Sequence, residues 1–117
     1  MDGVWDMVKL QMIDKVEVKT APIHKVEVSF MKSKPVQVGV SIQLGLSDGC
    51  TTFRDAVVTR EGNTVSINVT VQRPAGVFCP AIYTYFDTTV NLGSDFTPGA
   101  TYTLNVNDYS TTFIMMQ

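Results

Sequence analysis

The sequence predicts an all-β protein, an immunoglobulin-like or fibronectin-like antiparallel β-sandwich of seven or eight strands. Three observations carry this prediction. Apolar residues alternate with small or polar ones along most of the chain, which is the period of a strand with one buried face. Turn-forming residues separate these runs at intervals of about 8 to 12 residues, as in sandwiches and small barrels. A chain of 117 residues is long enough for one compact core and too short for two ordinary domains.

Composition narrows the classes of partner. Hydrophobic residues make up 44% of the chain and charged residues 17%, so the apolar surface is ample for a folded core. The net charge of -2 gives no broad positive field for phosphates, which excludes nucleic acid as an expected partner. No run of 18 apolar residues occurs, so we do not expect a membrane-spanning segment.

The chain begins with a segment, residues 1–23, that we interpret as an added strand preceding a sandwich domain at 24–117. Apolar residues alternate at Val8, Leu10 and Met12, although a helical spacing is also present there. The alternation favours the strand.

The strongest strand signal spans Val36 to Leu46, where every second residue is aliphatic and the intervening ones are small or polar. Shorter alternating runs predict further strands at 16–18, 26–30, 65–71 and 102–106, and the turn at 61–63 joins the strand at 65–71 to a strand-like segment at 56–59.

Two short connections predict antiparallel hairpins. Glu61-Gly62-Asn63 lies between two strand-like runs, and Asn107-Asp108 separates Val106 from Tyr109 with residue types that tolerate positive φ. Upstream of the second hairpin, Pro98-Gly99 precedes Tyr102 at the start of an alternating run. This resembles a tyrosine corner, in which the phenol hydrogen-bonds to upstream backbone. The alternative is an ordinary turn followed by a core tyrosine.

No catalytic, cofactor or metal constellation is expected. A nucleophilic cysteine needs a nearby base, and the only histidine, His24, stands far along the chain from Cys50 in an all-β context. Two distant cysteines and one histidine also lack the close-paired ligands of structural zinc. The remaining candidates are acidic residues at turns, which local backbone hydrogen bonds explain: Asp48, Asp55, Glu61, Asp87, Asp95 and Asp108.

An aromatic cluster allows two interpretations. Phe78, Tyr83, Tyr85 and Phe86 fall within a short stretch that contains the second cysteine. These residues form either a recognition surface or the packed face of a strand, and we favour core packing.

The two cysteines, Cys50 and Cys79, are as compatible with one disulfide as with two buried thiols in a cytoplasmic protein. The first residues lack the basic start and apolar stretch of a secretory signal, so we expect that any such signal was either never present or has been removed.

From Pro35 onward the sequence resembles a group of exported bacterial and archaeal immunoglobulin-like β-sandwich proteins of unassigned activity. The group's pattern contains Leu-Pro-Asp-Gly-Cys, Arg-x-Gly-Asn-Thr, Thr-x-Arg-Pro, a second cysteine and a Pro-Gly-x-Tyr-x-Val-x-Val-Asn-Gly run. The corresponding elements here are Leu46-Ser47-Asp48-Gly49-Cys50, Arg60-Glu61-Gly62-Asn63-Thr64, Gln72-Arg73-Pro74, Cys79 and Pro98-Gly99-Ala100-Thr101-Tyr102-Thr103-Leu104-Asn105-Val106-Asn107-Asp108. The departures are Ser47, Gln72 and Asp108, all at turns or strand surfaces.

The resemblance implies an extracellular or cell-envelope protein whose cysteines, Cys50 and Cys79, are paired. It supplies no catalytic residue.

We therefore expect a non-catalytic module that binds another protein or a cell-envelope component. The expected binding surface comprises two cysteine-tethered turns, Ser47–Asp55 and Arg73–Cys79. Its recognition residues are three charged side chains and one apolar anchor: Asp48, Arg54, Arg73 and Phe78. One alternative is a peptidase inhibitor that presents these loops to a protease cleft. Another is that both turns merely close the sandwich.

Overall fold

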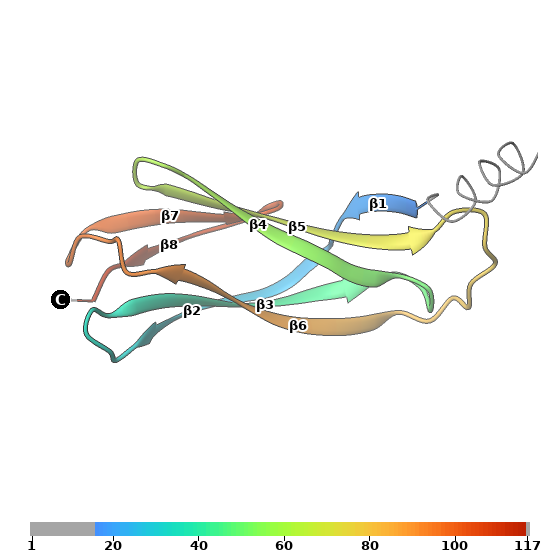
Figure 1. The fold of residues 1–117 in the computed structure, drawn as a ribbon, viewed down its shortest axis with the longest axis horizontal. Coiled ribbons are helices and arrows are strands. Elements are labelled where there is room, and N and C mark those ends of the chain that lie inside the picture. The colour runs from blue at the N-terminus through green and yellow to red at the C-terminus, as the bar shows by residue number, and fades with distance from the viewer. Residues whose placement is uncertain (1–15, 117) are drawn as a thin grey trace, which may run out of the picture.

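The computed structural model describes residues 16–116, which form eight β-strands arranged in two sheets that face one another (Figure 1). The strands are β1 (Val16–Thr20), β2 (Ile23–Met31), β3 (Gln37–Leu46), β4 (Thr52–Glu61), β5 (Thr64–Pro74), β6 (Thr84–Gly93), β7 (Thr101–Val106) and β8 (Tyr109–Ile114). The predicted all-β sandwich of seven or eight strands is confirmed. Within the described residues, no helix is long and apolar enough to cross a membrane.

The five-stranded sheet is built around β5. One edge of β5 pairs with β4 along nearly its whole length, from Thr64 to Gln72. The opposite edge is shared by two shorter strands, β7 against Thr64–Ile67 and β1 against Thr70–Pro74. Strand β8 completes the sheet beside β7.

The three-stranded sheet has the order β2-β3-β6, with β3 in the centre and both pairs antiparallel. The inward residues of β3 are Val38, Val40, Ile42 and Leu44, each at most 1% exposed. The alternating pattern of this strand is therefore the pattern of a buried face, as predicted.

The core lies between the two sheets and forms one cluster. The five-stranded sheet contributes inward residues from β5, β7 and β8, and the connections add Ala21 and Phe96. The largest fully buried side chains are Tyr102, Ile42, Leu44, Ile67 and Leu104.

Both predicted hairpins are present: β4 and β5 meet at Gly62-Asn63, and β7 and β8 meet at Asn107-Asp108. The antiparallel pairing expected for the sandwich holds for every described strand pair except β5 and β7, which are parallel. The reason is topological. The chain crosses to the other sheet for β6 and returns over 94–100, so β7 runs in the same direction as β5.

Part of the N-terminal segment is a strand, since β1 pairs with β5 and is followed by buried Ala21. The strand predicted around Val8, Leu10 and Met12 lies outside the described residues.

Candidate functional site

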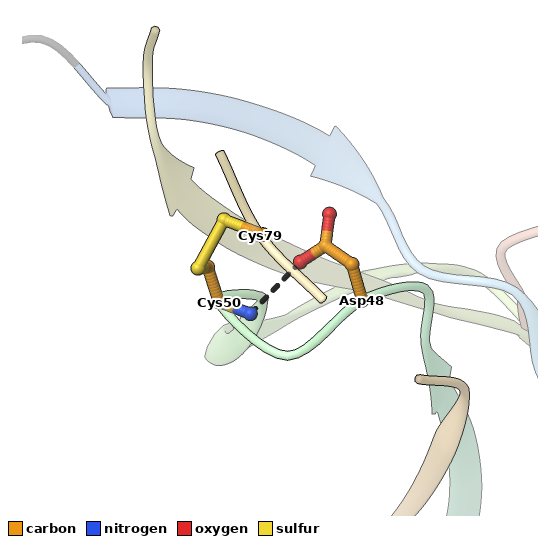
Figure 2. Close-up of side chains that lie close together, drawn as sticks. All are labelled: Asp48, Cys50 and Cys79. Carbon is orange, nitrogen blue, oxygen red and sulfur yellow. Dashed lines mark hydrogen bonds between the residues drawn. A yellow bond between two sulfur atoms is a disulfide. The ribbon is translucent and has the colours of Figure 1, made fainter. Parts of the chain in front are cut away.

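A disulfide joins two connections at one end of the sandwich. The turn at 47–51 links β3 to β4, and the loop at 75–83, here called the tethered loop, links β5 to β6. Cys50 of the turn and Cys79 of the tethered loop are bonded, with their Cα atoms 5.7 Å apart (Figure 2). This pairing, implied by the family resemblance, is confirmed. Each of these connections runs from one sheet to the other, so the bond ties two inter-sheet connections together.

Asp48 organises the turn. Its Oδ1 accepts hydrogen bonds from the Cys50 backbone N–H at 2.9 Å and from the Thr51 hydroxyl at 2.8 Å. Aspartate commonly forms such local bonds, which fix a turn without regular structure. The Thr51 hydrogen bond, the Cys50 N–H and the nearby Arg73 charge together lower the pKa of Asp48, against the opposing effect of desolvation. The carboxylate is therefore ionised at neutral pH.

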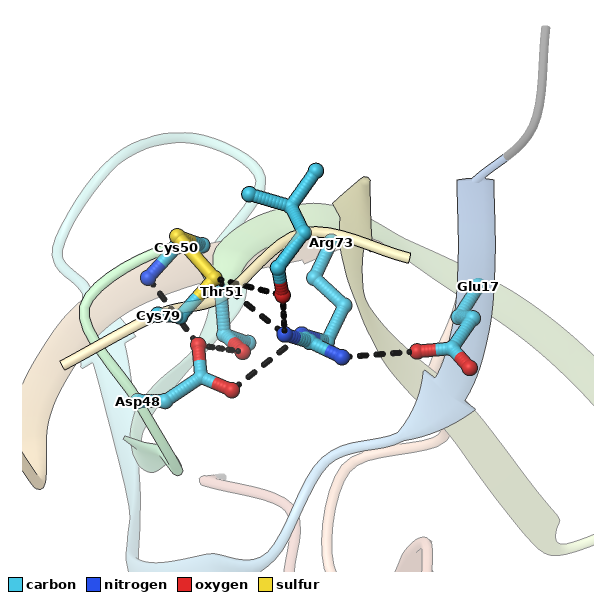
Figure 3. A network of polar contacts seen from close by, with 7 residues as sticks. Glu17, Asp48, Cys50, Thr51, Arg73 and Cys79 are labelled. Atoms are coloured by element: carbon cyan, nitrogen blue, oxygen red, sulfur yellow. Dashed lines mark hydrogen bonds and ion pairs between the residues drawn. A yellow bond between two sulfur atoms is a disulfide. The ribbon is translucent and has the colours of Figure 1, made fainter. Parts of the chain in front are cut away.

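Arg73, at the end of β5, contacts three segments at once (Figure 3). Its Nη1 donates to Glu17 Oε2 of β1 at 3.0 Å, and its Nη2 donates to the Val77 carbonyl at 3.0 Å. Nη2 also lies 3.1 Å from Cys79 Sγ. Nε lies 3.2 Å from Asp48 Oδ2 as an ion pair, although it is not aligned for a hydrogen bond. The guanidinium fork thus holds the turn, the tethered loop and β1 together.

The same residues resemble a metal-ligand set, because potential ligand atoms of Asp48, Cys50 and Cys79 lie within 4.8 Å of one another. Two features argue against that role in this state. Both sulfur atoms are consumed by the disulfide, and the cation beside the carboxylate is the Arg73 guanidinium. The cluster therefore acts as a structural clamp.

The tethered loop exposes apolar side chains. Phe78 is 96% exposed, and Val77 and Ile82 are 46% and 56% exposed. Large apolar residues are common on protein surfaces singly, but several within one short, covalently fixed loop are unusual. The core position that we favoured for the aromatic stretch is wrong for Phe78, because the loop projects beyond the end of the sandwich.

Tyr83 and Tyr85 are also outside the core, at 47% and 60% exposed. Together with His24 they form an aromatic cluster on the outer face of the three-stranded sheet, with ring centroids 5.0 to 5.7 Å apart. The Tyr83 hydroxyl hydrogen-bonds to His24 Nε2. Tyr83 lies over Gly45 of β3, where a Cβ atom would collide with its hydroxyl.

The sequence contained a signal for this cluster. Gly45 interrupts the small-polar face of the Val36–Leu46 run, and a glycine within a strand often marks a close approach of another group. Phe86 behaves differently from its neighbours: it is 39% exposed and stacks on Phe53 of the opposite sheet, with ring centroids 5.2 Å apart.

The other predicted site residues are distributed as follows. Asp48 and Arg73 are paired with each other, while Arg54 on β4 pairs with its neighbour Asp55 at 3.3 Å. Tyr102 is 2% exposed, and its hydroxyl accepts a 2.7 Å hydrogen bond from the Thr97 backbone N–H. The bond to upstream backbone that defines a tyrosine corner is therefore present.

Fold and site together define a disulfide-clamped β-sandwich domain with an apolar loop at one end. Residues 40–115 match the ORF11 beta-sandwich domain family, and the chain belongs to this family. No solved structure matches significantly.

Two similar relatives come from Herpetosiphon aurantiacus. The chain is 40% identical over 86 residues to the "Uncharacterized 10.2 kDa protein in HgiCIIM 5'region", covering 74% of this chain and 90% of the relative. It is 43% identical over 76 residues to the "Uncharacterized 10.2 kDa protein in HgiBIM 5'region", and this match covers 65% of this chain and 92% of the relative. These relatives agree with the expected family of uncharacterised small β-sandwich proteins.

Proposed function

We propose that this domain is a non-catalytic binding module that engages a protein partner, such as a cell-envelope component, through the tethered loop. The observation that carries the proposal is the 96% exposure of Phe78 in a loop that a disulfide and Arg73 hold in place. Because Phe78 is exposed to water in the free domain, burying its side chain against a partner would contribute favourable hydrophobic free energy to binding.

Preorganisation supports the same role. A mobile loop loses conformational entropy on binding, whereas a loop already fixed to its neighbours loses less. Here the fixing contacts are Cys50–Cys79, the bond from Arg73 to the Val77 carbonyl, and a 2.9 Å bond from the Gly49 N–H to the Pro80 carbonyl. Arg73 and Asp48 would then position the loop instead of touching the partner.

Export fits this assignment. Structural disulfides form in oxidising compartments, so the Cys50–Cys79 bond supports an extracellular or cell-envelope location. The resemblance to exported sandwich proteins points the same way.

The absence of a catalytic role is part of the proposal. The cysteines are bonded to each other, the Asp48 carboxylate is paired with Arg73, and His24 is engaged with Tyr83. None of these groups is arranged as a nucleophile beside a general base.

A peptidase inhibitor is the second candidate. Inhibitory loops present one protruding side chain next to a rigid support, and Phe78 protrudes beside the disulfide cysteine Cys79. If the domain is an inhibitor, its partner is an endopeptidase whose substrate cleft accepts an aromatic side chain.

Affinity capture from the native cell envelope tests the proposal, using the parent domain, Phe78→Ala and the control Ile114→Ala. Ile114 is 63% exposed but lies on β8, outside the tethered loop. The proposal expects one protein that the parent and Ile114→Ala retain and that Phe78→Ala loses. Equal retention by all three would exclude the tethered loop as the binding surface. If the parent inhibits an endopeptidase that is specific for aromatic residues and Phe78→Ala does not, the domain is a peptidase inhibitor.

A further inference from the structure

A polar groove runs over the outer face of the three-stranded sheet. Because Val40, Ile42 and Leu44 of β3 point into the core, the residues between them point outward. The register aligns Lys25 with Gln43 and Asp87, and aligns Glu27 with Ser41 and Thr89. These six side chains line an open depression of about 300 Å³.

The central strand keeps the groove open because its outward residues are small or medium-sized. Gly39, Ser41 and Gly45 carry little or no side chain, while the flanking strands carry longer ones. The depression therefore has a floor on β3 and walls on β2 and β6.

A β-bulge shapes the end of the groove nearest the disulfide. Ile23 pairs with Leu44 and Lys25 pairs with Gln43, so His24 is the extra residue on β2. The bulge brings His24 beside Lys25 on the outer face, where it contacts Tyr83 and Tyr85. Tyr83 lies across Gly45 and closes this end, and Tyr85, two residues before Asp87, borders it.

The electrostatics of the groove disfavour an anionic ligand and offer a cationic ligand only one uncompensated carboxylate, that of Asp87. Lys25 is its one cation, and Nζ lies 3.0 Å from Glu27 Oε1. The hydrogen bond and charge of Glu27, with a smaller contribution from Asp87, raise the pKa of Lys25. The Glu27 carboxylate already compensates the charge of the Lys25 ammonium, so the ammonium attracts an anionic ligand only weakly. The ammonium in turn compensates one of the two carboxylates that could attract a cationic ligand.

The groove lining offers alternating donors and acceptors: an amide, two hydroxyls, two carboxylates and an ammonium. An apolar ligand would leave these groups unpaired, which is costly. A neutral molecule rich in hydroxyl groups pairs with them, because each hydroxyl both donates and accepts. The C–H face of a pyranose ring also packs well on an exposed aromatic ring, which Tyr85 supplies.

We infer that the outer face of the β2-β3-β6 sheet binds a neutral oligosaccharide, with one sugar ring against Tyr85 and sugar hydroxyls hydrogen-bonded by Gln43 and Asp87. The residues that would contact the sugar, Gln43, Tyr85 and Asp87, all lie on β3 and β6 outside the tethered loop, although Tyr83 at the end of that loop closes one end of the groove. The inference therefore does not depend on the proposed protein partner.

Affinity electrophoresis tests the inference, with native gels that contain dextran, xylan, galactomannan or laminarin as neutral probes and alginate as an anionic probe. The parent domain is expected to migrate more slowly in at least one neutral gel and normally in alginate. Retardation in none of the neutral gels, or in alginate alone, would overturn the inference.

Variants locate the site. Tyr85→Ala and Gln43→Ala should each weaken binding to the retarding polysaccharide by about tenfold, the effect of losing one contact of ordinary strength. Phe78→Ala on the tethered loop and Ile114→Ala on β8 serve as matched exposed controls and should bind as the parent does. Circular dichroism confirms that each variant is folded. Unchanged binding by both groove variants, or equal loss in the controls, would refute the assignment.

Discussion

At position 107, one asparagine side chain fills a gap in the five-stranded sheet. The edge of β5 is paired with β7 up to Ile67 and with β1 from Thr70. Between them the Val69 carbonyl accepts from the Ala21 N–H at 2.9 Å, but the Val69 N–H has no backbone partner from a strand on that side. Asn107 Oδ1 accepts from the Val69 N–H at 2.9 Å, and Nδ2 donates to the Val69 and Ala21 carbonyls at 2.9 and 2.7 Å. The amide thus substitutes for a peptide group of a strand.

Replacing Asn107 with glycine should lower the free energy of unfolding by about 2 to 3 kcal/mol, because the Val69 N–H loses its partner. Glycine keeps the positive φ of 52° accessible, so the change isolates the amide. Urea denaturation measures the effect, and Asp108→Gly in the same hairpin is the control. Equal losses in both variants would show that backbone freedom, not the amide, is responsible.

Tyr102 is the second residue with a specific polar role in the core. Its ring packs against Phe96 and Phe113, with centroids 4.9 and 5.5 Å away, and its hydroxyl satisfies the Thr97 N–H. Tyr102→Phe keeps the ring contacts and leaves that N–H unpaired, so Tm should fall by about 4 to 8 °C. Differential scanning calorimetry is the measurement. An unchanged Tm would mean that the hydrogen bond contributes nothing net.

Asp48 makes the stability of the domain depend on pH in the acid range. Its pKa is lower in the folded protein than the ordinary value, so folding favours the carboxylate. The stabilisation is present above the unfolded-state pKa of about 4 and is lost as pH falls through the lower folded-state pKa. In Tm measured from pH 7 to pH 2, the parent should exceed Asp48→Asn at neutral pH, and the difference should narrow below about pH 4. A constant difference over the whole range would contradict this.

At the scale of elements, the strands were the part most fully predictable from the sequence. A two-residue period shows directly which face of a strand is buried, as Val38, Val40 and Ile42 illustrate. The hairpins followed because turn residues act locally. The parallel pairing of β5 with β7 was not predictable, since it depends on where the chain returns after β6 and no local pattern encodes that path.

The site was predictable only in part. The positions of both turns followed from the turn-forming residues Asp48-Gly49 and Pro74. The spacing of Tyr83 and Tyr85 places both on one face of a strand, but it does not show whether that face is buried or exposed. Both side chains are exposed because they lie on the outer face of the three-stranded sheet, over which no other strand among residues 16–116 packs. The commitment of Arg73 to Asp48 and Glu17 depends on β1 lying next to β5, a contact between segments distant in sequence.

The Cys50–Cys79 disulfide links segments distant in sequence covalently, as the ion pairs of Arg73 link them non-covalently. It joins residues 29 positions apart, and restricting a loop of that size in the unfolded chain contributes about 3 to 4 kcal/mol by chain-entropy reasoning. Reduction should therefore lower the Tm of the parent clearly and leave the Tm of a Cys50→Ala/Cys79→Ala variant unchanged. Ellman titration of the denatured, unreduced protein should find no free thiol from this pair. Two free thiols would contradict the pairing.

At the scale of the whole molecule, the two sheets share one core. Ile42 of the three-stranded sheet and Leu104 of the five-stranded sheet are both at most 1% exposed and belong to the same cluster of buried side chains. Each sheet therefore depends on the other for a buried face, because neither has a second core of its own among the described residues. Cooperative unfolding of both sheets follows from this arrangement.

We accordingly expect Leu104→Ala to destabilise both sheets equally, although the change lies in only one. The lost burial and the resulting cavity should lower the free energy of unfolding by about 2 to 5 kcal/mol, while Ile114→Ala on the exposed face of β8 should change it by less than about 0.5 kcal/mol. Native-state hydrogen exchange reports on each sheet separately, through the backbone N–H groups of Ile42 and Val69. In Leu104→Ala both groups should lose protection by the same factor, because global unfolding exposes them together. Loss confined to Val69 would show that the sheets unfold independently.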